Sequence, residues 1–123
     1  MSRFLAVATG GALGAMSRYA VALLVAMFWV RDFPLATFLI NVSGSFVLGF
    51  FTTFAAEKIA LDPLWRLLVG TGFVGAYTTF STFEYETQRL AETGAILWAA
   101  FNVIASVAAG LAAVQLGVFL ARR

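Results

Sequence analysis

The sequence contains neither cysteine nor histidine among its 123 residues. Without cysteine there is no thiolate catalysis and no disulfide, and without either residue type there is no Cys/His zinc site and no histidine general base. Charge is scarce as well, because 11% of the residues are charged, against about 25% in a typical soluble domain. The net charge of +2 indicates loop anchoring at a membrane and not a nucleic-acid-binding surface. An enzyme is the least favoured class, since the sequence shows no nucleophile–base pair and no metal-ligating cluster.

Hydrophobic residues make up 62% of the chain. A soluble protein of this size could not bury so much apolar surface, because small domains have a high ratio of surface to volume. A transmembrane helix needs about 20 apolar residues, so four helices and their loops account for the length. The composition therefore predicts an all-α membrane protein with a single domain over residues 1–123. We place its spans at residues 4–29, 35–56, 64–83 and 94–120, and a polar stretch at 84–92.

The basic residues are distributed unevenly over the predicted loops. Four spans place both termini and the loop between the second and third spans on one side of the membrane. Five basic residues fall on that side and two on the other: Arg3, Lys58, Arg66, Arg122 and Arg123 against Arg31 and Arg89. Basic residues favour the cytoplasm, so the difference favours cytoplasmic termini. It is small enough to permit insertion in both orientations.

Small residues at helical spacing predict where the spans approach one another closely. We expect ordinary tight packing of the bundle at these positions. They are Gly10 and Gly14, Ser45 and Gly49, the glycines at 70, 72 and 75, and the alanines at 105, 109 and 113.

The third predicted span contains a segment poorly suited to a continuous helix. Residues 70–83 read GTGFVGAYTTFSTF. Glycine lowers helix stability and hydroxyl side chains compete for backbone groups, so we expect this helix to break within the membrane. Irregular backbone at that depth is tolerated only where it is buried in protein or lines a cavity. Carbonyl groups at such a break suit a cation and N–H groups suit an anion. The alternative is a slightly distorted packing helix.

Polar side chains occur in the spans on either side of that segment. Asn41 lies in the second span with Thr37 one turn before it, and Asn102 and Ser106 share a face of the fourth span. A buried asparagine must find hydrogen bonds, so Asn41 is either an interhelical polar contact or a pore-lining amide that donates to an anion. No acidic residue lies at comparable depth, and donors without acids suit an anion better than a cation.

Arg18 and two phenylalanines are further candidates. Arg18 lies about 21 Å along the first span at the helical rise, and a charge within the membrane is a functional candidate by default. The alternative is a structural arginine that caps a neighbouring helix end. Phe80 and Phe83 share a helix face. Their ring edges carry positive partial charge and could stabilise a small anion, although plain packing is the commoner role.

Three motifs carry a resemblance to a known family. They are GGALGAMSRY in the first span, the Thr37-x-x-x-Asn41-x-x-Gly44 pattern in the second, and GFVGAYTTFSTFEYET in the third. With these motifs the chain closely resembles the Fluc (CrcB) fluoride ion channels of microbes, over essentially its whole length. The third motif is the most specific of the three.

The resemblance implies a four-span subunit that pairs antiparallel with an identical copy, in dual topology. It implies two pores per homodimer, each lined by both subunits, and a central structural Na⁺ at the dimer interface. The implied activity is passive, selective export of fluoride from the cytoplasm through the inner membrane of a bacterium. The five-to-two count of basic residues sits awkwardly with dual topology, which works best with almost no bias.

The resemblance also assigns roles to residues of this chain. The pore residues it implies are Asn41, Phe80 and Phe83, with Thr37 beside them. The implied polar track consists of Ser81, Thr82, Asn102 and Ser106, although some members carry tyrosine in place of Asn102. The backbone carbonyls of Gly75 and Thr78 are implied to bind the Na⁺, and Arg18 and Glu86 to lie at the vestibule.

Three other functions compete with a fluoride channel. A proton-coupled drug or guanidinium exporter needs a carboxylate within the membrane, and the first two predicted spans contain none. A proton-coupled fluoride antiporter would likewise need a mid-membrane His, Asp or Glu. A structural or assembly protein has no need of the polar groups in the third span.

Overall fold

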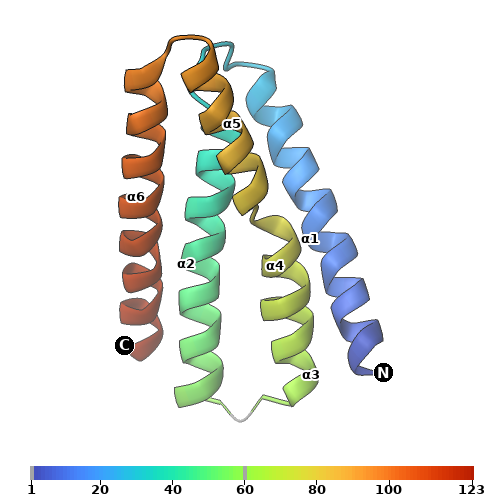
Figure 1. The fold of residues 1–123 in the computed structure, drawn as a ribbon. Helices are drawn as coiled ribbons and strands as arrows, with labels where there is room; N and C mark the ends of the chain where they lie inside the picture. Colours follow the sequence, from blue (N-terminus) through green and yellow to red (C-terminus); the bar gives the residue numbers. More distant parts are fainter. Residues whose placement is uncertain (1, 60) are drawn as a thin grey trace.

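The computed structural model describes residues 2–59 and 61–123, and within them it is entirely helical. The elements are α1 (Arg3–Ala26), α2 (Leu35–Glu57), α3 (Pro63–Trp65), η1 (Arg66–Val74), α4 (Gly75–Tyr77), α5 (Phe80–Glu92) and α6 (Ile96–Arg122). The chain runs along the bundle in alternating directions as α1, α2, the series α3 to α5, and α6 (Figure 1). Both termini lie at the end of the bundle that also holds the connection after α2, as the sequence predicted (Figure 1).

Three of the helices are long and apolar enough to cross a membrane. They are α1, α2 and α6, with mean hydropathies of 1.2, 1.7 and 2.2. Their bounds agree with the predicted spans 4–29, 35–56 and 94–120 to within three residues at each end. The third crossing is divided among shorter segments and does not qualify as one span among the described residues. This division confirms the expectation of a broken third helix.

Local signals set several helix ends. The Ser2 hydroxyl accepts a hydrogen bond from the Leu5 N–H at 3.2 Å and caps the start of α1. Pro34 directly precedes α2, where its missing N–H leaves no intrahelical bond unmade. Gly94 stands in the turn between α5 and α6 with φ of 84°, a conformation that glycine adopts without steric strain.

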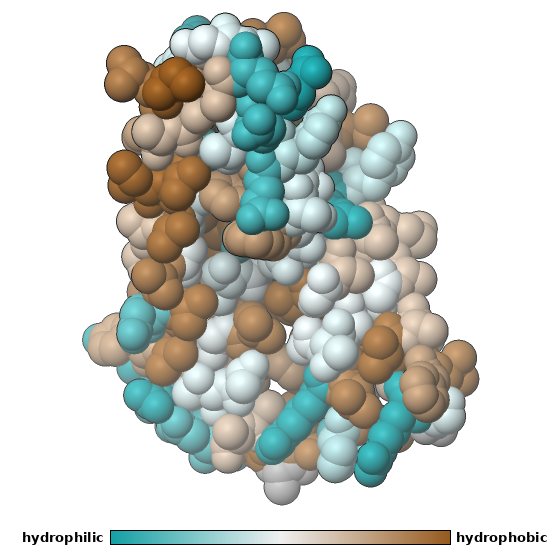
Figure 2. Space-filling view, in the orientation of Figure 1, coloured by the Kyte–Doolittle hydropathy of each residue, from teal (hydrophilic) through white to brown (hydrophobic). Residues whose placement is uncertain are grey.

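The predicted end of the third span at residue 83 falls inside a helix. The polar stretch 84–92 continues as α5 up to Glu92. This helix is amphipathic: it buries Phe83 and Leu90, packs against α6, and leaves charged residues on its other face. Its charged residues lower its average hydropathy, whereas its 3.6-residue period gives it an apolar face to bury. Figure 2 shows hydrophilic residues running down the upper half of the molecule, where Figure 1 places α5.

Of the glycines in residues 70–75, Gly72 serves close packing, and none of them marks the break. A Cβ built on Gly14 would lie 2.1 Å from the Phe73 carbonyl oxygen, and one on Gly72 would lie 2.8 Å from the Val7 carbonyl oxygen. Helices α1 and η1 therefore touch backbone to backbone. In the same way Gly49 of α2 meets Val114 of α6. The expectation of tight packing is confirmed at Gly10, Gly14, Gly49 and Gly72, whereas Gly70 and Gly75 make only ordinary contacts. The glycines at 70, 72 and 75 all lie in helical backbone before the break.

Large hydrophobic side chains face outward. The buried apolar residues include the small Ala6, Ala55, Ala99 and Ala121, whereas long side chains on α6 such as Leu97 and Ile104 are exposed. Hydrophobic residues line the α6 side of the molecule, and hydrophilic ones gather at the two ends (Figure 2). Exposed apolar helices around a core of small residues are typical of a protein that spans a lipid bilayer.

Candidate functional site

The third crossing is interrupted at Thr78 and Thr79. Helix α4 ends at Tyr77, Thr78 turns to ψ of 158°, and Thr79 is extended at φ −151° and ψ 114°. Helix α5 then begins at Phe80. The Thr79 hydroxyl caps it by accepting from the Thr82 N–H at 3.3 Å, and it donates to the Thr82 hydroxyl at 2.9 Å. A threonine cap of this kind stabilises a helix start after an extended residue.

Asn41 of α2 holds the break in place. Its side-chain oxygen accepts from the Thr79 N–H at 2.8 Å, and its Nδ2 donates to the Thr79 carbonyl at 2.9 Å. One carboxamide thus pairs both backbone groups of an extended residue that no helix can satisfy. Of the two roles considered for Asn41, the interhelical polar contact is present. One N–H of the amide remains for a further acceptor.

Other backbone groups at the break stay without partners in the part of the chain that is described. The Thr79 N–H would bond to the Gly75 carbonyl in a continuous helix, but it bonds to Asn41 instead. No hydrogen bond in this part reaches the carbonyls of Gly75 and Thr78, or involves the N–H groups of Phe80 and Ser81. The end of α4 is therefore a partial negative charge and the start of α5 a partial positive one.

A hollow of about 200 Å³ lies beside the break. Asn41 and Phe80 line it from either side, and Ser45, Thr78 and Thr79 add hydroxyl or backbone groups. The hollow brings the predicted pore asparagine next to one predicted pore phenylalanine and to the predicted sodium residue Thr78. It is polar at the break and apolar elsewhere, where Gly44, Leu48 and Val74 complete its wall.

A cluster of hydrogen-bonded polar side chains connects α5 and α6. Ser106 donates to the Asn102 oxygen at 3.3 Å, Asn102 donates to the Thr87 hydroxyl at 2.9 Å, and Thr87 donates to the Phe83 carbonyl at 2.7 Å. Asn102 is only 1% exposed. Sequence reasoning missed Thr87. Its spacing from Phe83 and Leu90, at i, i+4 and i+7 on one helix face, would have shown that it lies on the buried side of α5.

The rings of Phe80 and Phe83 lie side by side, between the break and the polar cluster on α5 and α6. The ring centroids of Phe80 and Phe83 are 5.8 Å apart with an interplanar angle of 38°. Phe83 is buried, whereas Phe80 is 70% exposed. Ser81 and Thr82 are exposed as well and do not meet the Asn102 and Ser106 pair within one chain. In a single chain, part of the predicted pore residues is therefore exposed at the subunit surface.

The remaining candidates lie apart from the break. Thr37 is buried in α2. Glu86 is half-buried, one of its carboxylate oxygens has no hydrogen-bond partner among the described residues, and it lines a hollow of about 330 Å³ with Arg31, Asp32 and Arg89. Arg18 is half-buried in α1 and makes no hydrogen bond or ion pair within residues 2–59 and 61–123. Its place at a vestibule stays a prediction.

Known proteins resemble nearly the whole chain. Residues 5–118 match the family described as CrcB-like protein, Camphor Resistance (CrcB). The chain is 50% identical over 118 residues to a fluoride-specific ion channel FluC of Methylococcus capsulatus, covering 96% of this chain and 52% of that relative. It is 46% identical to the fluoride-specific ion channel FluC of Acidobacterium capsulatum, over 98% of this chain and 97% of the relative.

A third relative supports the same comparison. The fluoride-specific ion channel FluC 1 of Streptomyces avermitilis is 50% identical over 119 residues, 97% of this chain and 95% of the relative. The chain spans about half the length of the Methylococcus relative and nearly all of the other two. The similarity therefore covers all the helices that build the break and the polar cluster on α5 and α6.

Proposed function

Because the chain belongs to the family of CrcB-like proteins, we propose that it is a fluoride-selective ion channel that exports fluoride passively from the cytoplasm. The family is one of ion channels and not of enzymes. The apolar helices and the channel relatives make the protein a multi-pass membrane protein. Its place in the inner membrane of a bacterium belongs to the proposal.

The observation that carries the proposal is the break at Thr78 and Thr79. Asn41 pairs with Thr79 and keeps a spare amide N–H, and the N–H groups of Phe80 and Ser81 have no partner among the described residues. Phe80 presents its ring beside them. These groups are donors or ring edges without a full positive charge. They stabilise an anion moderately, which a conducting site requires, because an ion held too tightly cannot leave.

The polar cluster on α5 and α6 extends this pathway. Thr87, Asn102 and Ser106 form a line of hydrogen bonds that starts at the Phe83 carbonyl. Fluoride is small and strongly hydrated, so a pore must replace its water by several donors in succession. Rotation of hydroxyl groups lets such a line offer donors to a passing anion. We propose that Ser81 and Thr82 contribute to the same track from the other subunit.

We propose that the functional unit is an antiparallel homodimer with two pores. The exposure of Phe80, Ser81 and Thr82 leaves one wall of the pathway missing in a single chain. A second copy in the opposite orientation would supply that wall twice by symmetry. Dual topology is compatible with the small difference in basic residues between the two ends.

A structural Na⁺ between the subunits fits the residues present. The carbonyls of Gly75 and Thr78 at the end of α4 have no hydrogen bond in the described part of the chain. Carbonyl oxygens at an interrupted helix suit Na⁺. Two such ends facing each other would repel, and a bound cation would offset that repulsion. Gly75 is exposed on the subunit surface, which leaves its carbonyl accessible to a second copy.

The test is fluoride efflux from liposomes that contain the purified protein. We expect rapid fluoride loss that depends on a K⁺ ionophore for charge balance, without chloride loss. Phe80→Ile should slow the efflux by about tenfold, because it removes the ring edge from the pathway. Phe4→Ile is the matched control, since Phe4 is 89% exposed at the start of α1. Equal efflux in both variants, or none in the unaltered protein, would contradict the proposal.

One observation favours a proton-coupled fluoride antiporter as a second candidate. The sequence placed Glu86 beyond the third span, but the structure puts it within α5, half-buried and with one unpaired oxygen. A carboxylate at that position could carry a proton. For an antiporter, Glu86→Gln would abolish the coupling of fluoride movement to an imposed pH gradient. For a channel, fluoride flux follows its own gradient in both proteins.

A further inference from the structure

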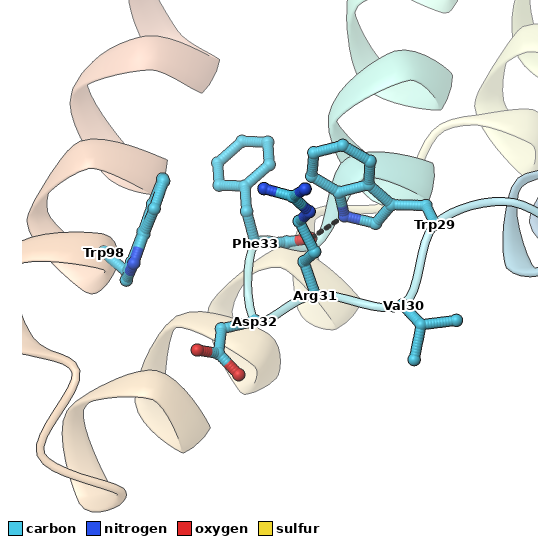
Figure 3. A pocket seen from close by; sticks show the side chains of 6 residues that line it. All are labelled: Trp29, Val30, Arg31, Asp32, Phe33 and Trp98. Atoms are coloured by element: carbon cyan, nitrogen blue, oxygen red, sulfur yellow. Dashed lines mark hydrogen bonds between the residues drawn. The ribbon is translucent and has the colours of Figure 1, made fainter.

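A pocket distinct from the break lies at the opposite end of the bundle from the termini. It occupies about 430 Å³ between the α1–α2 connection and the start of α6, and Trp29, Val30, Arg31, Asp32, Phe33 and Trp98 line it. Ligand pockets in proteins begin at about 300 Å³, so this volume suits a small polar group. Figure 3 shows Trp98 facing the pocket from α6, opposite Trp29 and Arg31, with Phe33 between them.

The aromatic wall of this pocket is held in place. Trp29 donates from its indole nitrogen to the Phe33 carbonyl at 2.8 Å, which fixes the connection between the helices (Figure 3). The rings of Phe33 and Trp98 are 5.9 Å apart. Phe33 is buried, so the wall does not depend on exposed side chains alone. Aromatic faces arranged in this way attract a cation.

Two opposite charges stand at the rim without pairing with each other. The Arg31 guanidinium lies 5.5 Å from the centre of the Trp29 ring. The carboxylate of Asp32 points away from it (Figure 3). The ion pair found within residues 2–59 and 61–123 is Arg122 with Glu57, so neither charge is neutralised there. Adjacent residues thus offer one site for an anion and a separate site for a cation.

Part of the pocket wall is apolar and exposed. Val30 lines it with an exposed fraction of 90%. Tryptophans at helix ends are typical of the membrane–water interface, where one side of the ring meets lipid and the other meets water. A ligand that reaches this pocket from the bilayer would therefore carry an apolar part next to a polar one.

We propose that this pocket binds the headgroup of a zwitterionic phospholipid with a primary ammonium. Arg31 holds the phosphate by charge-assisted hydrogen bonds. Asp32 accepts from the ammonium, and the face of Trp98 stabilises its charge, since Arg31 already lies over the Trp29 ring. The acyl chains extend over the exposed apolar side chains beside the pocket. Arg31 and Asp32 also line the hollow beside Glu86, but the pocket lies away from the break, and its assignment does not rest on fluoride conduction.

The experiment titrates dihexanoyl-phosphatidylethanolamine into the detergent-solubilised full chain and follows tryptophan fluorescence. A Trp65→Phe background leaves Trp29 and Trp98, both in the pocket, as the reporters. We expect saturable binding that Arg31→Gln and Asp32→Asn each weaken by about tenfold, while Arg31→Lys keeps most of it. Arg123→Gln is the matched control, because Arg123 also lies over an aromatic ring, Phe119, but at the other end of the bundle.

Two comparison ligands test the assignment further. Dihexanoyl-phosphatidylglycerol lacks the ammonium and should bind at least tenfold more weakly. Free phosphoethanolamine lacks the acyl chains and should also bind more weakly. Equal affinity for the two lipids, or unchanged affinity in Arg31→Gln and Asp32→Asn, would overturn the proposal. Binding of free phosphoethanolamine as tight as that of the lipid would overturn the lipid as its source. A fluorescence shift that never saturates would also overturn it, because it reports partition into the micelle alone.

Discussion

Asn41 illustrates how one side chain makes an irregular backbone tolerable within a membrane. Lipid offers no hydrogen bonds, so every exposed N–H and C=O group there must find a partner inside the protein. The amide of Asn41 carries a donor and an acceptor on one rigid group, and it satisfies both backbone groups of Thr79. The amide keeps one further N–H as a donor, and Asn41 lines the hollow beside the break. Structural and conducting roles are therefore compatible in one residue.

The first prediction concerns this pair of hydrogen bonds. Asn41→Ala should lower the free energy of unfolding by about 2 kcal/mol or more, because two backbone groups lose their partner in a buried setting. Thermal unfolding in detergent measures the change, beside fluoride efflux. Thr52→Ala, an exposed residue of the same helix, is the control and should change neither. An Asn41→Ala protein as stable as the control would contradict the proposed support of the break.

Sequence reasoning identified Asn41 as buried and in need of partners, but not what those partners are. Thr79 lies 38 residues away along the chain, and no local pattern relates the two. The spacing of Thr87 from Phe83 and Leu90 indicates its buried side of the helix, but not the groups that it meets there. Its role depends on the partners that α6 and the Phe83 carbonyl bring to it.

At the scale of elements, glycines decide which helices touch. Gly10 and Gly14 admit the backbone of η1 against α1, whereas a Cβ on Gly11 would meet nothing within 4 Å. These three residues share a helix and a residue type, yet only two of them face the contact. The difference provides a comparison in which helix propensity is the same and only packing differs.

The second prediction uses that comparison. Gly14→Ala should destabilise the protein by about 1–3 kcal/mol or prevent its folding, because its Cβ would overlap the Phe73 carbonyl. Gly11→Ala should be neutral or slightly stabilising, since alanine favours a helix more than glycine does. Thermal unfolding and yield in detergent report the difference. Equal behaviour of the two variants would show that α1 and η1 separate easily.

The amphipathic helix α5 shows that the average polarity of a segment does not indicate where a helix ends. Its charged residues make residues 84–92 a polar stretch of the sequence, and the helix continues through it to Glu92. The apolar positions Phe83 and Leu90 are few, and they become meaningful only when α6 is present to cover them. Periodicity within a polar segment therefore outweighs its average hydropathy.

At the scale of the whole molecule, the exposed apolar surface must be covered by lipid or by another protein chain. Many large apolar side chains are exposed along the helices, and lipid and a second copy of the chain both suit such a surface. Gly75 distinguishes the two. A Cβ at this position would lie 3.7 Å from the Gly70 carbonyl oxygen, an ordinary contact. A larger residue there is compatible with one folded chain and disturbs only what approaches from outside.

The third prediction follows from this difference. Gly75→Val should leave the helical content of the subunit intact but abolish dimer formation and fluoride efflux, because the proposed interface requires close backbone approach at the end of α4. Analytical ultracentrifugation in detergent measures the assembly, with and without Na⁺ in place of a large organic cation. Gly11→Ala serves again as a control. A dimeric, fully active Gly75→Val protein would exclude the proposed interface and its sodium site together.

The sequence by itself determined that this is a helical membrane protein and that residues 70–83 contain a weak point for a continuous helix. These follow from composition and short-range pattern, because apolar side chains leave water and glycines and hydroxyls weaken a helix wherever they occur. Only the tertiary structure decided that the break lies at Thr78 and Thr79, after the glycines and not among them. The position of a break within a membrane depends on where the freed backbone groups find partners, and here those partners come from Asn41 on another helix.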